Sequence, residues 1–131
     1  MATARPHAVS IDDAIATLTF LSNRSPMTTA EESSSAFARV SDYREGGVFV
    51  GHWAGNSEWE RHPVGDEIVM VVAGETTIFF LAEDGEHSKA LRLGDLIVVP
   101  QNTWHRFETP VEVKLLSVTP QPTDHQSDQP T

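Results

Sequence analysis

Two histidines and two glutamates in the middle of the sequence are the residues best suited to metal chemistry. Glu60 and His62 stand two residues apart, so on a β-strand their side chains point to the same face. Residues 63–66 indicate a turn, because proline presets φ and Gly65 allows a tight reversal. Glu67 opens the next apolar run. A hairpin of this kind directs three candidate ligands into one space.

A second stretch, residues 94–105, supplies the fourth candidate ligand, His105. Two imidazoles and two carboxylates suit one divalent transition metal, and Fe, Mn, Ni and Zn are all compatible with this set. In one arrangement Glu60 is a fourth ligand. In another, His62, Glu67 and His105 form a facial set, and Glu60 is a catalytic base beside it. The simplest alternative is a site without metal, in which Glu60 faces solvent at a strand end.

The first of these stretches resembles the first sequence motif of the cupin superfamily. That motif normally reads Gly, five residues, His-x-His, three or four residues, Glu, six residues, Gly. In this chain His62 is the second histidine, and Glu60 takes the place of the first. The gap from Glu67 to Gly74 matches the motif, and Ala54 stands where the leading glycine belongs.

The second stretch resembles the other cupin motif, which normally reads Gly, five residues, Pro-x-Gly, two residues, His, three residues, Asn. Gly94, Pro100 and His105 match it, whereas Asn102 and Thr109 replace the glycine and the asparagine. The resemblance implies an all-β fold, a cupin-type jelly-roll β-barrel. It also implies a metal held by the motif residues and a small molecule as ligand or substrate.

The surrounding sequence predicts the strands that would position these ligands. From residue 46 onward, short runs rich in β-branched and aromatic residues alternate with Gly, Pro and Asp-Gly turns, which is typical of a sandwich or barrel. The lack of a helical pattern between them argues against βαβ units. We expect the cupin barrel to span residues 46–119. The expected strands are residues 48–53, 58–62, 67–73, 75–81, 87–93, 96–99, 104–108 and 111–118.

The two ends of the chain are expected to lie outside the barrel. Residues 1–45 should form a flanking segment with one or two short helices. Ser10 can cap the first helix, and overlapping Thr-x-x-Glu capping boxes near Thr29 predict a second one over residues 30–40. Residues 120–131 are polar and contain proline, so a disordered tail is expected there.

Strand alternation also assigns the side chains near the ligands. Phe107 shares the parity of His105 and should face the barrel interior, whereas Arg61 and Arg106 should point outward. His125 lies outside both motifs, and we interpret it as a solvated surface residue.

The composition narrows the possible partners. The chain has 131 residues, which suggests one domain, and a formal net charge of −10. This charge disfavours nucleic acid and anionic membrane surfaces, and no apolar run approaches membrane-spanning length. The lack of cysteine excludes disulfides and thiolate ligands. A cytoplasmic location is the default expectation, and the uncovered strand edges of an open jelly roll predict a homodimer.

Two classes of function fit these expectations. The first is a small metal-dependent enzyme of the dioxygenase, isomerase or lyase type, acting on a small organic molecule, with Glu60 positioned to move a proton. The alternative is a non-catalytic cupin that binds or senses a small ligand, with or without a degenerate metal site. The metal content of the purified protein separates the two classes.

Overall fold

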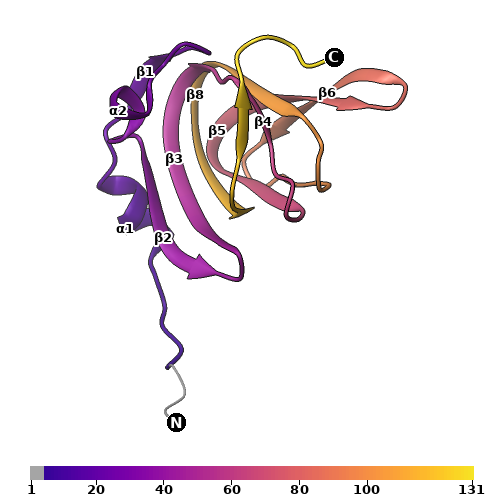
Figure 1. Cartoon of the computed structure of the whole chain (residues 1–131). Coiled ribbons are helices and arrows are strands. Elements are labelled where there is room, and N and C mark those ends of the chain that lie inside the picture. Colours follow the sequence, from indigo (N-terminus) through magenta and orange to yellow (C-terminus); the bar gives the residue numbers. More distant parts are fainter. Residues whose placement is uncertain (1–4) are drawn as a thin grey trace.

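The computed structural model describes residues 5–131, and this range contains two short helices and nine strands (Figure 1). None of the described helices is long and apolar enough to cross a membrane. In chain order the elements are α1 (Ile11–Ala16), β1 (Leu21–Arg24), α2 (Ala30–Ser33), β2 (Phe37–Tyr43), β3 (Gly46–Asn56), β4 (Trp59–Arg61), β5 (Glu67–Ala82), β6 (Gly85–Arg92), β7 (Leu96–Val99), β8 (His105–Pro120) and β9 (Asp124–Gln126).

Three long strands, β3, β5 and β8, form the frame of the fold. β8 pairs antiparallel with both β3 and β5, and β5 and β8 are each 16 residues long. β6 and β7 pair with β5, β1 and β2 pair with β3, and β4 pairs with β8 and β9. The strands curl around one core without closing into a complete ring (Figure 1). This architecture confirms the all-β jelly roll expected from the sequence.

The core lies on the inner face of the frame strands. Along β8, Val113 and Leu115 are buried, whereas Lys114 and Leu116 are only partly buried, as strand alternation requires. The core continues through an aromatic group on the inner face, in which Trp53 lies 5.4 Å from the Phe37 ring and 5.9 Å from the Phe107 ring, centroid to centroid.

Strand β5 is longer than the sequence predicts. The two strands expected at residues 67–73 and 75–81 are one strand, because Gly74 adopts φ +74° and bends the chain without ending it. A Cβ at this position would lie 2.2 Å from the carbonyl oxygen of Glu112, so the close crossing of β5 and β8 requires glycine.

Strand β8 likewise joins two expected strands, residues 104–108 and 111–118. It passes through Pro110 by shifting its register with β3. Trp53 pairs with Val113, but Gly55 pairs with Thr109. The extra residues form a bulge, and such irregularities are where a sheet accommodates proline.

The second N-terminal helix is shorter than expected. α2 begins with the predicted capping box, in which Thr29 and Glu32 exchange side-chain and backbone hydrogen bonds. It ends at Ser33 instead of continuing to residue 40. The hydroxyls of Ser33 and Ser34 bond back to carbonyls three residues earlier, and such serines weaken a helix. Residues 37–43 instead join β3 as β2.

The first helix, α1, is capped as the sequence predicts, since the Ser10 hydroxyl accepts a hydrogen bond from the Asp13 N–H. Its residue Ile15 is buried against β3. The next element, β1, was not predicted. It runs parallel to β3, with Leu21 opposite Trp53 and Arg24 opposite Gly55.

The C-terminal residues differ from the disordered tail expected from their composition. Asp124–Gln126 form β9, which pairs antiparallel with β4. Arg61 of β4 donates two hydrogen bonds, 3.0 and 2.8 Å long, to one oxygen of the Asp124 carboxylate. The pairing of β9 with β4 satisfies backbone N–H and C=O groups. In a disordered tail, these groups would be hydrogen-bonded to water.

The outer face of β5 and β7 carries exposed apolar side chains. Ile68 is paired with Val98 and Met70 with Leu96, so these four side chains lie on one face of the sheet. Leu96 and Val98 are 55% and 50% exposed.

Candidate metal centre

The four candidate ligands come from three strands that meet at one end of the core. Glu60 lies on β4, His62 directly follows this strand, and Glu67 and His105 are the first residues of β5 and β8. Glu60 and His105 are directly opposed in the β4–β8 pair, which directs both side chains to the same face.

Two loops near these residues are tied to each other. The backbone N–H of Gln101 donates to Asp66, and its side-chain amide donates to the carbonyl of Pro63. The N–H of Asn102 donates to the carbonyl of His62. The turn after His62 and the loop before His105 therefore fix each other, although they are almost 40 residues apart.

Two imidazole nitrogens and one carboxylate oxygen converge in the interior. Nε2 of His105 lies 3.0 Å from Oε1 of Glu67, and Nε2 of His62 lies 3.3 Å from the same oxygen. The three side chains are 1–7% exposed. None of these three atoms makes a hydrogen bond of acceptable geometry within residues 5–131. Buried polar atoms are normally hydrogen-bonded, so three unpaired atoms directed at one point fit a shared metal ion.

Each of these three side chains is fixed through its other polar atom. An Nδ1–H that donates a hydrogen bond leaves Nε2 as a free lone pair, which is the form of histidine that binds a metal. The contacts are His62 Nδ1 to Thr123 Oγ1 (3.0 Å), His105 Nδ1 to the Thr103 carbonyl (2.9 Å), and the Thr119 hydroxyl to Glu67 Oε2 (2.6 Å).

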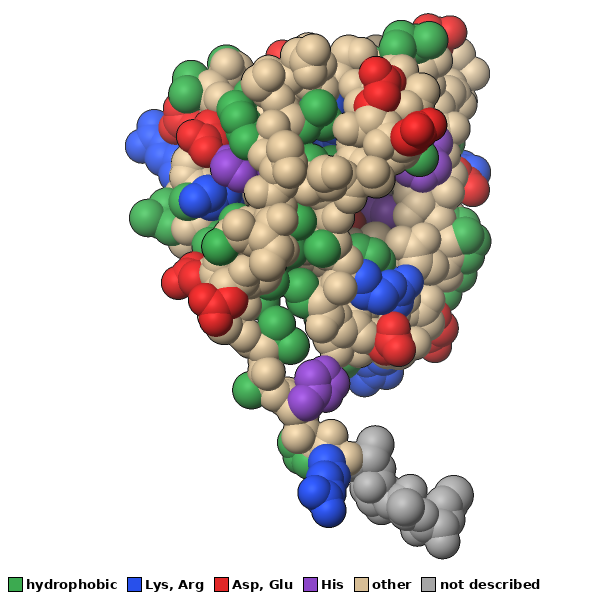
Figure 2. Space-filling view, turned by 90° about the vertical axis from the view of Figure 1, so that its left-hand side faces the viewer, with side chains coloured by type: hydrophobic (Ala, Val, Ile, Leu, Met, Phe, Trp, Pro, Cys, Tyr) green, Lys and Arg blue, Asp and Glu red, His purple; other side chains and the backbone are tan. Residues whose placement is uncertain are grey.

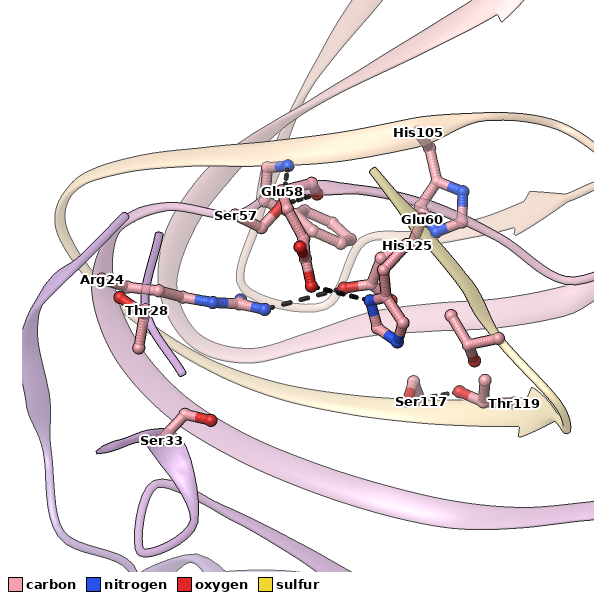
Figure 3. Close-up of polar contacts among 12 residues, drawn as sticks. Arg24, Thr28, Ser33, Ser57, Glu58, Glu60, His105, Ser117, Thr119 and His125 are labelled. Atoms are coloured by element: carbon pink, nitrogen blue, oxygen red, sulfur yellow. Dashed lines mark hydrogen bonds and ion pairs between the residues drawn. The ribbon is translucent and has the colours of Figure 1, made fainter. Parts of the chain in front are cut away.

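The fourth candidate, Glu60, approaches the same pair of imidazoles. A carboxylate oxygen of Glu60 and one nitrogen of each of His62 and His105 lie within 4.8 Å of one another. Glu60 also forms an ion pair with Arg24, with 3.6 Å between Oε1 and a guanidinium nitrogen (Figure 3). The Glu60 carboxylate is therefore shared between the histidine pair and a largely buried cation.

The charges of the buried cluster stabilise one another. Burial by itself would raise the pKa of Glu67, but the contacts with His105 and His62 outweigh burial and lower this pKa to about 2. Burial also opposes the charged form of His105, but its contact with Glu67 outweighs burial and raises the pKa of His105. The site therefore favours a carboxylate at Glu67.

A cavity of about 860 Å³ opens in front of the cluster. Its lining includes Glu60, Glu67 and Phe107 together with Arg24 and Phe37. Figure 2 shows the face that carries β1, α2 and β2, with a hollow inside which a histidine side chain is visible. The volume lies within the range of small-molecule sites.

The inward position of Phe107 is confirmed, since its side chain is buried and lines the cavity. Arg106 packs away from the cavity over the rings of Phe79 and Trp59. Arg61 lies over the ring of Trp104 and pairs with Asp124 outside the cavity.

Sequence reasoning missed Arg24 and His125 as residues of the cavity. His125, interpreted as a surface residue, lines the cavity, and its Nδ1 lies 2.8 Å from Oε1 of Glu58 (Figure 3). Arg24 reaches the cavity from β1. Burial lowers the pKa of Arg24, and the charges of Glu60 and Glu58 offset this effect only in part. The one local signal was Gly55, whose lack of a side chain allows the Arg24 backbone to approach closely.

Comparison with known proteins agrees with this architecture. The model of the cupin domain matches residues 51–119, more than half of the chain. The chain belongs to the cupin family. An uncharacterised protein, YdbB, of Bacillus subtilis (strain 168) is 30% identical over 79 residues, which make up 60% of this cupin chain and 67% of that protein.

Solved structures show the same fold at low sequence identity. Protein NMB1881 from Neisseria meningitidis is 16% identical with a TM-score of 0.64, over 88% of this cupin chain and 100% of that chain. Hydroquinone 1,2-dioxygenase PnpCD, in complex with Cd²⁺ and 4-hydroxybenzonitrile, is 22% identical with a TM-score of 0.56, over 64% and 63% of the two chains. Cupin folds thus include metal-containing enzymes.

Proposed function

We propose that this cupin is a metal-dependent enzyme that acts on a small organic molecule. One divalent transition metal would be bound by His62, Glu67 and His105. Glu60 would be either a fourth ligand or a base next to the metal. The observation that carries this proposal is the convergence of three buried, unpaired ligand atoms, with 3.0 and 3.3 Å between the carboxylate oxygen and the two imidazole nitrogens.

A metal at this position would act as a Lewis acid toward an oxygen atom of the substrate. The protein's own residues would supply the remaining functions. The Thr103 carbonyl accepts from Nδ1 of His105 and fixes the tautomer of this ring, and the Thr123 hydroxyl orients the ring of His62. Glu60 lies at the cavity wall, where its carboxylate can accept a proton from a bound molecule and forms an ion pair with Arg24.

The donor set and the fold support a dioxygenase, isomerase or lyase type of reaction. Two imidazoles and one or two carboxylates suit Fe, Mn, Ni or Zn. The structurally similar PnpCD is a dioxygenase, which supports a place for this cupin among metal enzymes.

Metal content is the direct test of the proposal. The protein is purified without chelator, and bound metal is measured by native mass spectrometry and elemental analysis. His62→Ala and His105→Ala should each lose most of the metal, because each removes one of three converging ligands. His87→Ala is the matched control, since His87 is a surface histidine paired with Asp84. Equal metal content in all four proteins would contradict the proposal.

The second candidate function is a non-catalytic cupin that binds or senses a small ligand. The observation that favours it is the cavity itself, whose apolar and hydroxyl-bearing walls can hold a ligand without a metal. A ligand that binds only the folded protein must stabilise it. A metal-free protein whose melting temperature does not change with Mn, Fe, Ni or Zn would favour this second function.

A further inference from the structure

We propose that Arg24 binds the carboxylate group of the cavity's ligand, and that the substrate is therefore a small organic acid with an apolar body. This inference deepens the proposed function by naming the substrate class. The Arg24 contact itself requires no metal, so the two proposals can fail separately.

The guanidinium of Arg24 is held in place by two aromatic rings. Its central carbon lies 4.9 Å from the centroid of the Phe37 ring and 4.7 Å from that of Trp53. The side chain is only 14% exposed. Cation–π contacts of this kind fix the plane of the guanidinium but use none of its N–H donors.

The donors of Arg24 are not engaged by Glu60 at hydrogen-bond distance. Their closest approach is 3.6 Å, which is longer than a hydrogen bond. The other nearby carboxylate, Glu58, is paired with His125 at 2.8 Å. Figure 3 shows the guanidinium pointing from the cavity wall toward Glu60. The planar donor group therefore faces the cavity, where it can receive a carboxylate through two parallel hydrogen bonds.

Glu60 connects this anchor to the proposed metal. Its carboxylate is within reach of His62 and His105 as well as of Arg24. A cation between the histidines would attract Glu60 and leave Arg24 without its partner. The positive charge of Arg24 would then be available to an anionic ligand at the same moment that the metal is in place.

The position of Arg24 depends on an unusual backbone contact. β1 runs parallel to β3, and Arg24 is opposite Gly55. Gly55 has φ +104°, and a Cβ there would lie 2.1 Å from the carbonyl oxygen of Arg24. Only glycine permits this approach, so the glycine at residue 55 allows Arg24 to lie in the cavity wall.

The other residues that line the cavity indicate the chemistry of the rest of the ligand. Its walls include the aromatic or aliphatic side chains of Phe37, Phe49, Val69, Phe107 and Leu115. These surfaces favour an apolar group, whereas Arg24 lies next to the candidate ligand Glu60. An aromatic carboxylic acid combines both features.

Benzoate and its neutral analogue benzamide are suitable probes. Their binding to the full chain is measured by isothermal titration calorimetry, after the metal alone has been titrated into the same samples. We expect benzoate to bind more tightly than benzamide. Arg24→Gln should weaken benzoate binding about tenfold or more and change benzamide binding by less than about twofold, because only the charged hydrogen bonds are lost. Arg39→Gln is the matched control, since Arg39 also stacks on an aromatic ring but does not line the cavity.

A metal-free arm separates the two proposals. In the absence of metal, Glu60→Gln should strengthen benzoate binding about two- to fivefold, because a competing carboxylate is removed.

Failure of metal to bind, together with benzoate binding that depends on Arg24, would overturn the metal site and leave the anchor. Equal binding of benzoate and benzamide, or unchanged benzoate binding in Arg24→Gln, would overturn the anchor. If Arg24→Gln does not fold, benzoate is added to the wild type and the NMR resonance of the Arg24 Nε–Hε group is followed. The absence of a chemical-shift change would overturn the proposal.

Discussion

Glu60 and His105 are direct partners in the antiparallel pair of β4 and β8. Because sheet hydrogen bonds fix both backbones, the separation between this carboxylate and this imidazole is set by the sheet and not by a loop. His62 is positioned differently. It precedes a turn that Gln101 links by hydrogen bonds to the loop before His105. The candidate site thus combines three ligands on strands, Glu60, Glu67 and His105, with one ligand, His62, held by two linked loops.

The first prediction concerns the role of Glu60. Glu60→Gln should lower metal affinity by about tenfold, which is less than the loss in His62→Ala, because Arg24 already competes for the Glu60 carboxylate. Affinity is measured by competition with a chromophoric chelator. Unchanged affinity would show that Glu60 is not a ligand and leave it the role of base.

The second prediction concerns the hydrogen bond that orients His62. Thr123→Val removes the hydroxyl 3.0 Å from Nδ1 of His62 and should weaken metal binding about 10- to 100-fold. Thr103→Val is a closely matched control, because Thr103 contacts His105 through its backbone carbonyl, which the substitution retains. Equal metal affinities of the two variants would contradict the orienting role of Thr123.

The third prediction concerns the contact between Gly55 and Arg24. Gly55→Ala should destabilise the protein by about 1–3 kcal/mol more than Gly85→Ala in urea denaturation. Both glycines have positive φ, but a Cβ at Gly85 meets nothing within 4 Å, whereas one at Gly55 meets the Arg24 backbone. Equal losses would mean that β1 moves away at little cost.

The fourth prediction concerns assembly, which remains a prediction from the sequence. A homodimer would cover the exposed apolar face of Ile68, Leu96 and Val98. Light scattering at micromolar concentration should give twice the monomer mass. Val98→Lys should lower the mass to that of one chain, whereas Val111→Lys, at a position 75% exposed on β8, should not. A monomeric wild type would contradict the prediction.

The sequence could predict the four candidate ligands because each lies in a short stretch of recognisable spacing, although the fold brings these stretches together from almost 40 residues apart. Pro63 and Gly65 reveal the turn that separates His62 from Glu67, and the spacing of the second motif reveals His105. The strand β7 was predicted with its exact bounds, since its apolar run lies between Gly94 and Pro100. These sequence patterns lie within short stretches and can be recognised without knowledge of the fold.

Two further residues that line the cavity could not be predicted in the same way. Arg24 and His125 reach the cavity through the pairing of β1 with β3 and of β9 with β4. Both strands are only three or four residues long and polar, so they have no apolar alternation to reveal them. These two segments are strands because a neighbouring strand pairs with them, which is a tertiary interaction. Composition alone would assign both segments to loops.

The two walls of the cavity differ in the length of the elements that build them. Arg24 lies at the end of β1, a four-residue strand next to the four-residue helix α2, whereas Glu67 and His105 begin strands of 16 residues. Short peripheral elements exchange their amide hydrogens through local opening, whereas frame strands exchange only on global unfolding. The amides of β1 should therefore exchange with deuterium much faster than those of β5 and β8. Because Arg24 lies on β1, a bound acid should slow exchange in β1.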